Sequence, residues 1–169
     1  MKDITIYDDS IKKYHAQYKL PYTWTLLKAQ LMAESGLNPN AVSPVGAKGL
    51  AQFMPDTWTE YLTKCSLPAT TQACNGEASI KCCAAYMADL IKGWSSPRPE
   101  LDRYNLALAS YNAGMGNLIK AQKIVHGVND YATIVSALKF VTGNANAKQT
   151  TDYVNRITDY NIQLLKPRT

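Results

Sequence analysis

Glu34 is the acidic side chain whose setting in this 169-residue sequence best suits chemistry. Trp24, Leu27, Leu31 and Glu34 follow one another at offsets of three, four and three, so a helix would place them on one face. Apolar neighbours disfavour the charged carboxylate, and the partial negative charge of a helix C-terminus repels it. Both effects predict a raised pKa, toward roughly 6 or 7, which suits a general acid. The alternative is an ordinary solvated glutamate.

The segment after Glu34, "GLNPNAVSPVGAKGLAQFMP" (36–55), is rich in Gly and Pro. Such a loop exposes backbone donors and acceptors, along which an extended polar polymer can lie. Protonation of a glycosidic oxygen is one reaction that fits. Ordinary glycosidases use two carboxylates, but this region offers one. Asp56 follows Pro55 at a predicted helix start, where capping explains it better than catalysis.

Helical spacing of apolar side chains recurs along the chain, and no hairpin signal or long alternating strand is present. The predicted helices cover 7–18, 22–35, 55–62, 80–94, 101–111, 118–125, 131–138 and 153–164. Gly36 is expected to cap the C-terminus of the predicted helix 22–35. Asp130 is expected to cap the N-terminus of the predicted helix 131–138. The sequence therefore predicts an all-α protein with one domain, 1–169.

The net charge of +5 favours an anionic partner, such as nucleic acid, anionic lipid or a cell-wall polymer. The basic residues are scattered, with no run of five, which disfavours nucleic acid. No apolar run approaches the roughly 18 residues of a membrane span, so stable membrane insertion is not expected.

The four cysteines, Cys65, Cys74, Cys82 and Cys83, do not have zinc-site spacing, so no metal is expected. A bond between the adjacent Cys82 and Cys83 is disfavoured. Two arrangements stay open: Cys65 and Cys74 each bonded to the helix that carries Cys82 and Cys83, or four reduced thiols. Disulfides would place the protein outside the cytoplasm. The N-terminus lacks the apolar core of a secretory signal.

Three motifs, in this order, resemble those of the soluble lytic transglycosylase family, whose catalytic domain is related to goose-type lysozyme. They are Glu34-Ser35 with "NPNAVSPVGAKGLAQFMP", then "ALASYNAGMGNL" from Ala107, then "QTTDYVNRI" from Gln149. The resemblance implies a lysozyme-like α-helical domain with a substrate groove. It implies cleavage of the β-1,4 bond between N-acetylmuramic acid and N-acetylglucosamine in peptidoglycan, with formation of a 1,6-anhydro ring and no cofactor.

Individual residues acquire expected roles from this resemblance. Glu34 matches the catalytic acid, and Tyr111 matches the tyrosine that orients it. The expected substrate-binding residues are Ser43, Gln52, Met54, Asn112, Gln149 and Tyr153. Turn formation is the alternative for Ser43 and Asn112, and core packing for Tyr111 and Tyr153.

The chain departs from the family pattern at three positions. Ala51 stands where Met is frequent, Ser110 where Ala is frequent, and Gln149 where many relatives have Glu. Gln149 therefore removes a second carboxylate from the groove.

Two other functions remain open: a lysozyme that hydrolyses the same bond, and a wall-binding module that does not cut. The expected partner is peptidoglycan, and the protein is expected to be a monomer that acts in the periplasm or cell wall. A phage endolysin or virion-borne wall hydrolase, or a mature form whose signal has been removed, fits the missing signal.

Overall fold

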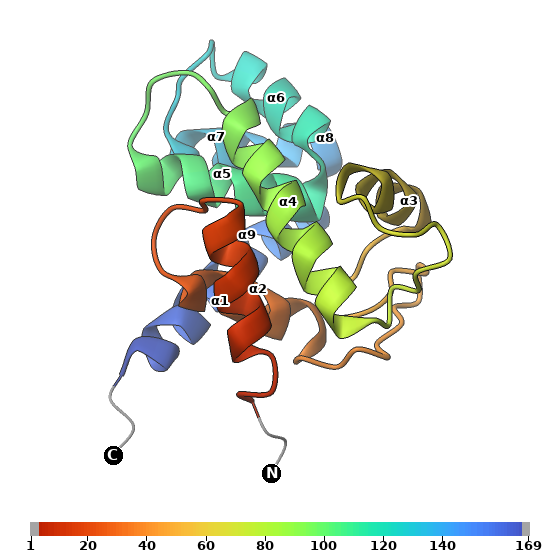
Figure 1. Ribbon diagram of the computed structural model, residues 1–169. Coiled ribbons are helices and arrows are strands. Elements are labelled where there is room, and N and C mark those ends of the chain that lie inside the picture. The colour runs from red at the N-terminus through yellow and green to blue at the C-terminus, as the bar shows by residue number, and fades with distance from the viewer. Residues whose placement is uncertain (1–3, 167–169) are drawn as a thin grey trace. The chain divides into compact units, whose positions relative to one another are not determined.

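Helices form where buried side chains recur three or four residues apart, as at Ile80, Cys83 and Met87, which are fully buried. The computed structural model describes residues 4–166. Its helices are α1 (Asp8–Gln17), α2 (Trp24–Ser35), α3 (Pro55–Lys64), α4 (Gly76–Gly93), α5 (Glu100–Ala113), α6 (Met115–Ile124), α7 (Tyr131–Ala137), α8 (Lys139–Thr142) and α9 (Asn144–Leu165) (Figure 1). Those residues contain no strand, and two isolated bridges pair Lys48 with Val42 and with Phe53. The all-α prediction is confirmed.

The described part of the chain divides into two units. The first unit runs to Ala88 and resumes at Ile157, and the second unit is Asp89–Arg156. Helices α1 to α3 belong to the first unit and α5 to α8 to the second, whereas α4 and α9 each run from one unit into the other. No helix within residues 4–166 combines the length and the apolar character needed to cross a membrane.

In the first unit, α1 packs against α2. Every residue of α2 from Thr25 to Leu31 is buried, and Lys28, at 1% exposure, forms an ion pair with Asp8 of α1. The helix ends where Gly36 adopts φ +58° and donates its N–H to the Met32 carbonyl at 2.9 Å. The predicted cap at Gly36 is thus confirmed.

Backbone hydrogen bonds order the loop between α2 and α3. The Lys48 and Phe53 backbones exchange two bonds, of 2.9 and 3.0 Å. Gly49, at φ +79°, fits closely against the next loop: a Cβ atom at this position would lie 2.0 Å from the Ala73 carbonyl oxygen. The loop therefore holds one conformation that glycine alone accommodates without strain.

The start of α3 differs from the prediction in one respect. The helix begins at Pro55, as expected, but its N-cap is Met54. The predicted capping role of Asp56 is therefore wrong. Asp56 lies in the first turn, where its negative charge is favourable beside the positive end of the helix.

In the second unit, α5 packs against α6 and α7, and α8 packs against the same two helices. The indole Nε1 of Trp94 donates to the Ser110 hydroxyl at 3.0 Å, and both residues are buried. The Asp130 carboxylate accepts the Thr133 N–H at 2.8 Å, so the predicted N-cap is confirmed. That bond lowers the pKa of Asp130.

Two features of this unit differ from what the sequence pattern predicts. Leu101 opens the apolar stripe of the predicted helix 101–111, but it is 56% exposed, because it lies in the first turn of α5, two residues after the Pro99 N-cap. The short helix α8 was not predicted, because four residues are too few to show a periodic pattern.

Candidate functional site

Glu34 lies in the last turn of α2 and is partly exposed. Its neighbour Ser35 fixes this helix end: the Ser35 hydroxyl donates to the Leu50 carbonyl at 2.8 Å and accepts the Asn38 N–H at 3.3 Å. The carboxyl group is therefore carried by a helix whose end is bonded to the loop that follows.

The loop places three of the expected binding residues in the first unit. Gln52, at φ +50°, donates its side-chain amide to the carbonyls of Ala41 and Gly49, at 3.2 and 3.0 Å. Gln52 thus braces the loop from within. Ser43 accepts the Ala47 N–H at 3.0 Å, which is the turn-forming role that the sequence left open. Met54 is 44% exposed, so its side chain is available for contacts.

The other expected residues lie in the second unit, on two helices. Tyr111 and Asn112 belong to the last turn of α5, and Gln149 and Tyr153 lie one turn apart on α9. Tyr111 is partly exposed, whereas Tyr153 is 2% exposed. Burial favours the packing role for Tyr153, because almost none of its side chain is left for a ligand.

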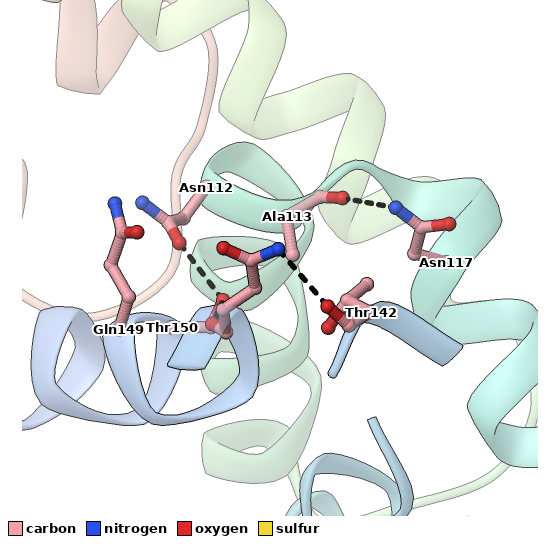
Figure 2. Close-up of a pocket in the computed structure, with 7 residues that line it drawn as sticks. Asn112, Ala113, Asn117, Thr142, Gln149 and Thr150 are labelled. Atoms are coloured by element: carbon pink, nitrogen blue, oxygen red, sulfur yellow. Dashed lines mark hydrogen bonds between the residues drawn. The ribbon is translucent and has the colours of Figure 1, made fainter. Parts of the chain in front are cut away.

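Asn112 and Gln149 line one pocket of about 220 Å³ in the second unit, shown in Figure 2. Its other lining residues are Ala113, Asn117, Thr142, Asn146 and Thr150. Four side chains are carboxamides and two are hydroxyls, and none ionises. The volume lies below the ~300–1,000 Å³ of typical drug-sized sites, so the pocket suits one small polar group.

The hydrogen bonds around the pocket determine what it offers a ligand. The Asn117 and Asn146 amide nitrogens donate to the carbonyls of Ala113 and Thr142, at 2.8 and 3.0 Å, which leaves their side-chain oxygens as acceptors. The Asn112 oxygen lies 2.9 Å from the Thr150 hydroxyl that donates to it, which leaves the Asn112 nitrogen as a donor.

Gln149 adds a free amide to the same pocket. Its side chain is exposed and has no hydrogen bond to any residue that the structure describes. In Figure 2 the Gln149 side chain rises from α9, and its amide is drawn close to the Asn112 amide at the end of α5. The pocket therefore presents N–H donors and C=O acceptors, which is the pattern that complements a secondary amide or a sugar hydroxyl.

The sequence pattern does not identify Asn117, Thr142 and Asn146 as pocket residues. One signal was available, because Asn146, Gln149 and Thr150 lie at i, i+3 and i+4 and so share one face of a helix. The contribution of α6 and α8 depends on how the helices of this unit pack, which no local pattern contains.

A more charged pocket, of about 340 Å³, lies in the first unit and is lined in part by Tyr14, Glu77 and Lys81. It does not provide an acid. Glu77 accepts bonds from Lys13 at 2.8 Å and from Tyr14 at 2.7 Å, and chiefly the Lys13 bond lowers the pKa of Glu77. Across residues 4–166, no three His, Cys, Asp or Glu side chains gather closely enough to hold a metal ion.

Comparison with known proteins identifies related sequences. A family model described as the transglycosylase SLT domain matches residues 9–134. The membrane-bound lytic murein transglycosylase F of Maricaulis maris is 30% identical over 162 residues, covering 86% of this chain and 34% of that protein. The protein of the same name from Shewanella oneidensis is 34% identical over 105 residues, covering 62% of this chain and 20% of that protein.

A solved structure shares the fold. The 70 kDa soluble lytic transglycosylase of Escherichia coli matches with a TM-score of 0.72 and 25% identity, over 93% of this chain and 24% of that one. The lysozyme-like helical fold expected from the sequence is therefore confirmed. The chain spans only about a fifth to a third of the length of these relatives.

Proposed function

The chain belongs to the transglycosylase SLT domain family, and on this basis we propose that it is a peptidoglycan lytic transglycosylase. It would cleave the β-1,4 bond between N-acetylmuramic acid and N-acetylglucosamine and leave 1,6-anhydromuramic acid ends. One observation carries the proposal: the family match over residues 9–134 includes Glu34, the loop up to Pro55 and Tyr111. The relatives reported above are named as lytic transglycosylases.

In the proposed reaction, Glu34 acts first as an acid and then as a base. Its carboxyl donates a proton to the glycosidic oxygen, and the bond from that oxygen to C1 of muramic acid breaks. The 6-hydroxyl of the same sugar then bonds to C1 and gives its proton to the Glu34 carboxylate. No water is consumed, and Glu34 returns to its protonated form.

This reaction is compatible with a single acidic side chain. A hydrolase of the usual kind needs a second carboxylate, about 5 Å away for retention or further for inversion. An intramolecular hydroxyl replaces that group, and holding the hydroxyl close to C1 supplies rate through high effective molarity. The enzyme then has to bind and orient the glycan, which is the task of its polar side chains.

Asn112 and Gln149 are proposed to bind substrate in the amide-lined pocket, together with Asn117 and Asn146. An acetamido group has one N–H and one C=O, which match the free acceptors and donors of this pocket. Because none of the lining residues ionises, we expect binding of the neutral trisaccharide tri-N-acetylchitotriose to depend little on pH or salt. Ser43, Gln52 and Met54 are the proposed contacts in the first unit.

The proposed role of Tyr111 is to orient the catalytic carboxyl, as the family resemblance implies. Tyr111→Phe keeps the ring and removes only the hydroxyl. We expect it to lower turnover while binding of the glycan is retained, and equal turnover would assign Tyr111 to packing alone.

The proposed place of action is the bacterial cell wall, with peptidoglycan strands as the partner of a monomeric enzyme. The net charge of +5 supports encounter with this anionic polymer. A phage endolysin is the more specific proposal: expression in the bacterial cytoplasm should then cause lysis only when a membrane-permeabilising protein is also expressed. Lysis without that protein would count against this origin.

Mass spectrometry of muropeptides released from purified peptidoglycan tests the reaction. Wild type should release fragments one water lighter than lysozyme products, and Glu34→Gln should release none. Glu60→Gln is the matched control, because Glu60 is an exposed residue paired with Lys64, and it should behave as wild type. Fragments of full mass would make the protein a hydrolase. Binding without release by wild type would leave a wall-binding module.

A further inference from the structure

Gln30 is the exception among the buried polar side chains. Within residues 4–166, six polar or charged side chains are buried: Thr25, Lys28, Gln30, Ser79, Ser110 and Thr150. All of them except Gln30 have a hydrogen-bond partner. Gln30 is 0% exposed, yet neither its amide nitrogen nor its amide oxygen has a hydrogen-bond partner in this part of the chain.

An unpaired amide in the interior destabilises a folded protein. Its donor and acceptor have lost their hydrogen bonds to water and have gained none in exchange. Apolar side chains fill the neighbouring positions Leu27, Ala29 and Leu31 of α2 without this cost. A residue that breaks the rules of stable packing is expected chiefly at a functional site, where another requirement outweighs stability.

The place of Gln30 on α2 relates it to Glu34. The two residues lie four positions apart within the helix Trp24–Ser35, so they share one face, one turn apart. Residues at this spacing have Cβ atoms about 5–6 Å apart, which two long side chains can bridge. Helical side chains also lean toward the helix N-terminus, so the Glu34 side chain lies over the turn that contains Gln30.

The other polar side chains of α2 are less able to serve the Glu34 carboxyl. Lys28, the second charged residue of this helix, forms an ion pair with Asp8 and points about 120° away from Glu34 around the helix. The Ser35 hydroxyl already donates to the Leu50 carbonyl. On the Glu34 face of α2, Gln30 therefore supplies the N–H groups that have no other acceptor.

We propose that Gln30 is a positioning residue for Glu34, a role that rests on the function proposed above. When Glu34 gives its proton to the glycosidic oxygen, its carboxylate becomes charged and accepts an N–H of the Gln30 amide. This bond stabilises the charged carboxylate more than the neutral carboxyl that precedes it. An interaction that strengthens as charge develops raises turnover more than affinity.

Gln30→Met tests this hydrogen bond without reference to activity. Methionine is unbranched and flexible like glutamine, so it fills the same space, but it carries no N–H donor. We expect the pKa of the Glu34 carboxyl, measured by NMR titration, to rise by about one unit, because the charged form loses its donor. An equal pKa in Gln30→Met and wild type would overturn the proposal.

Turnover, affinity and stability separate a positioning role from a structural one. In Gln30→Met, release of muropeptides from purified peptidoglycan should slow about tenfold or more, because a hydrogen bond to a charged group is lost. Affinity for tri-N-acetylchitotriose should stay unchanged. The urea midpoint should not fall, because the variant removes an unpaired amide. A lower midpoint with unchanged turnover would make Gln30 a structural residue and overturn the proposal.

Leu26→Met is the matched control. Leu26 is buried one turn before Gln30 and two turns before Glu34, so the same side chain is introduced out of reach of the carboxyl. It should leave the Glu34 pKa and turnover at their wild-type values. Equal effects of Leu26→Met and Gln30→Met would assign the change to packing and overturn the proposal. Gln30→Leu provides the same comparison if Gln30→Met does not fold.

Failure of the proposed function would give a different result. Wild type that releases no fragments lighter by one water would reject the transglycosylase reaction, while the NMR titration of Glu34 would still report on the hydrogen bond. Wild type that releases such fragments, with equal turnover and equal Glu34 pKa in Gln30→Met, would reject the role of Gln30 alone.

Discussion

Gly49 is the position where one added methyl group has the clearest structural consequence. In Gly49→Ala the new Cβ would lie 2.0 Å from the Ala73 carbonyl oxygen, and φ is +79°. We expect the free energy of unfolding to fall by about 3 kcal/mol or more, because backbone atoms have to move.

Gly46→Ala is the matched control for this substitution. Gly46 has a similar φ of +89°, but a Cβ there has no atom within 4 Å. Only backbone strain remains, which costs about 1–2 kcal/mol. Urea titration of both variants measures the difference, and equal losses would show that the contact with Ala73 contributes nothing.

A second prediction for a single side chain is the raised pKa expected for the Glu34 carboxyl. Its place in the last turn of α2 confirms the helix end on which the argument for a raised pKa depends. NMR titration of the Glu34 carboxyl checks this prediction directly. A value near 4 would remove the electrostatic argument and leave the proposed role dependent on family membership.

Asp8 of α1 neutralises a lysine that is buried in α2. In Asp8→Asn the Lys28 ammonium, 1% exposed, would lose its charged partner. We expect a loss of roughly 3 kcal/mol in the free energy of unfolding, because an uncompensated charge stays buried. Asp9→Asn is the control: the Asp9 carboxylate is fully exposed and pairs weakly with Lys12 at 3.8 Å, so this change should have little effect.

His15, in the last turn of α1, is expected to make the stability of the protein depend on pH. Burial lowers the pKa of His15 below 6.5, and contacts with the Pro21 and Tyr22 carbonyls only partly oppose this. The unfolded chain therefore binds the proton more readily, so His15 contributes stability fully above pH 6.5 and loses it as the pH falls toward the lowered pKa.

Replacement of His15 tests whether this residue makes stability fall as the pH falls. The urea midpoint of wild type should fall between pH 7.5 and 5.5, and His15→Gln should flatten that fall. His126→Gln removes the chain's other histidine and serves as the matched variant. An unchanged slope in His15→Gln would assign the effect to other groups.

Most helices could be predicted because their signals are local. Apolar spacing, Gly36 as a C-cap and Asp130 as an N-cap all act within one or two turns. The pocket around Asn112 could be predicted only in part, because Asn117 and Thr142 reach it through the packing of α5, α6 and α8.

The chain as a whole is predicted to unfold as one domain. Two units can be distinguished, but α4 and α9 both run through the boundary between them. We expect one calorimetric transition whose measured enthalpy equals the van't Hoff enthalpy. Asp8→Asn, a change in the first unit, should shift that transition as a whole, and two separate transitions would contradict the prediction.

Because α4 and α9 each contain residues of both units, they also limit how the genes of related proteins can recombine. An exchange of residues 89–156 between two relatives would build α4 and α9 each from segments of two different parents. Each junction would preserve the helix only if buried positions on both sides continued one apolar stripe. We therefore expect the two units to be inherited together, with crossovers tolerated in the loops.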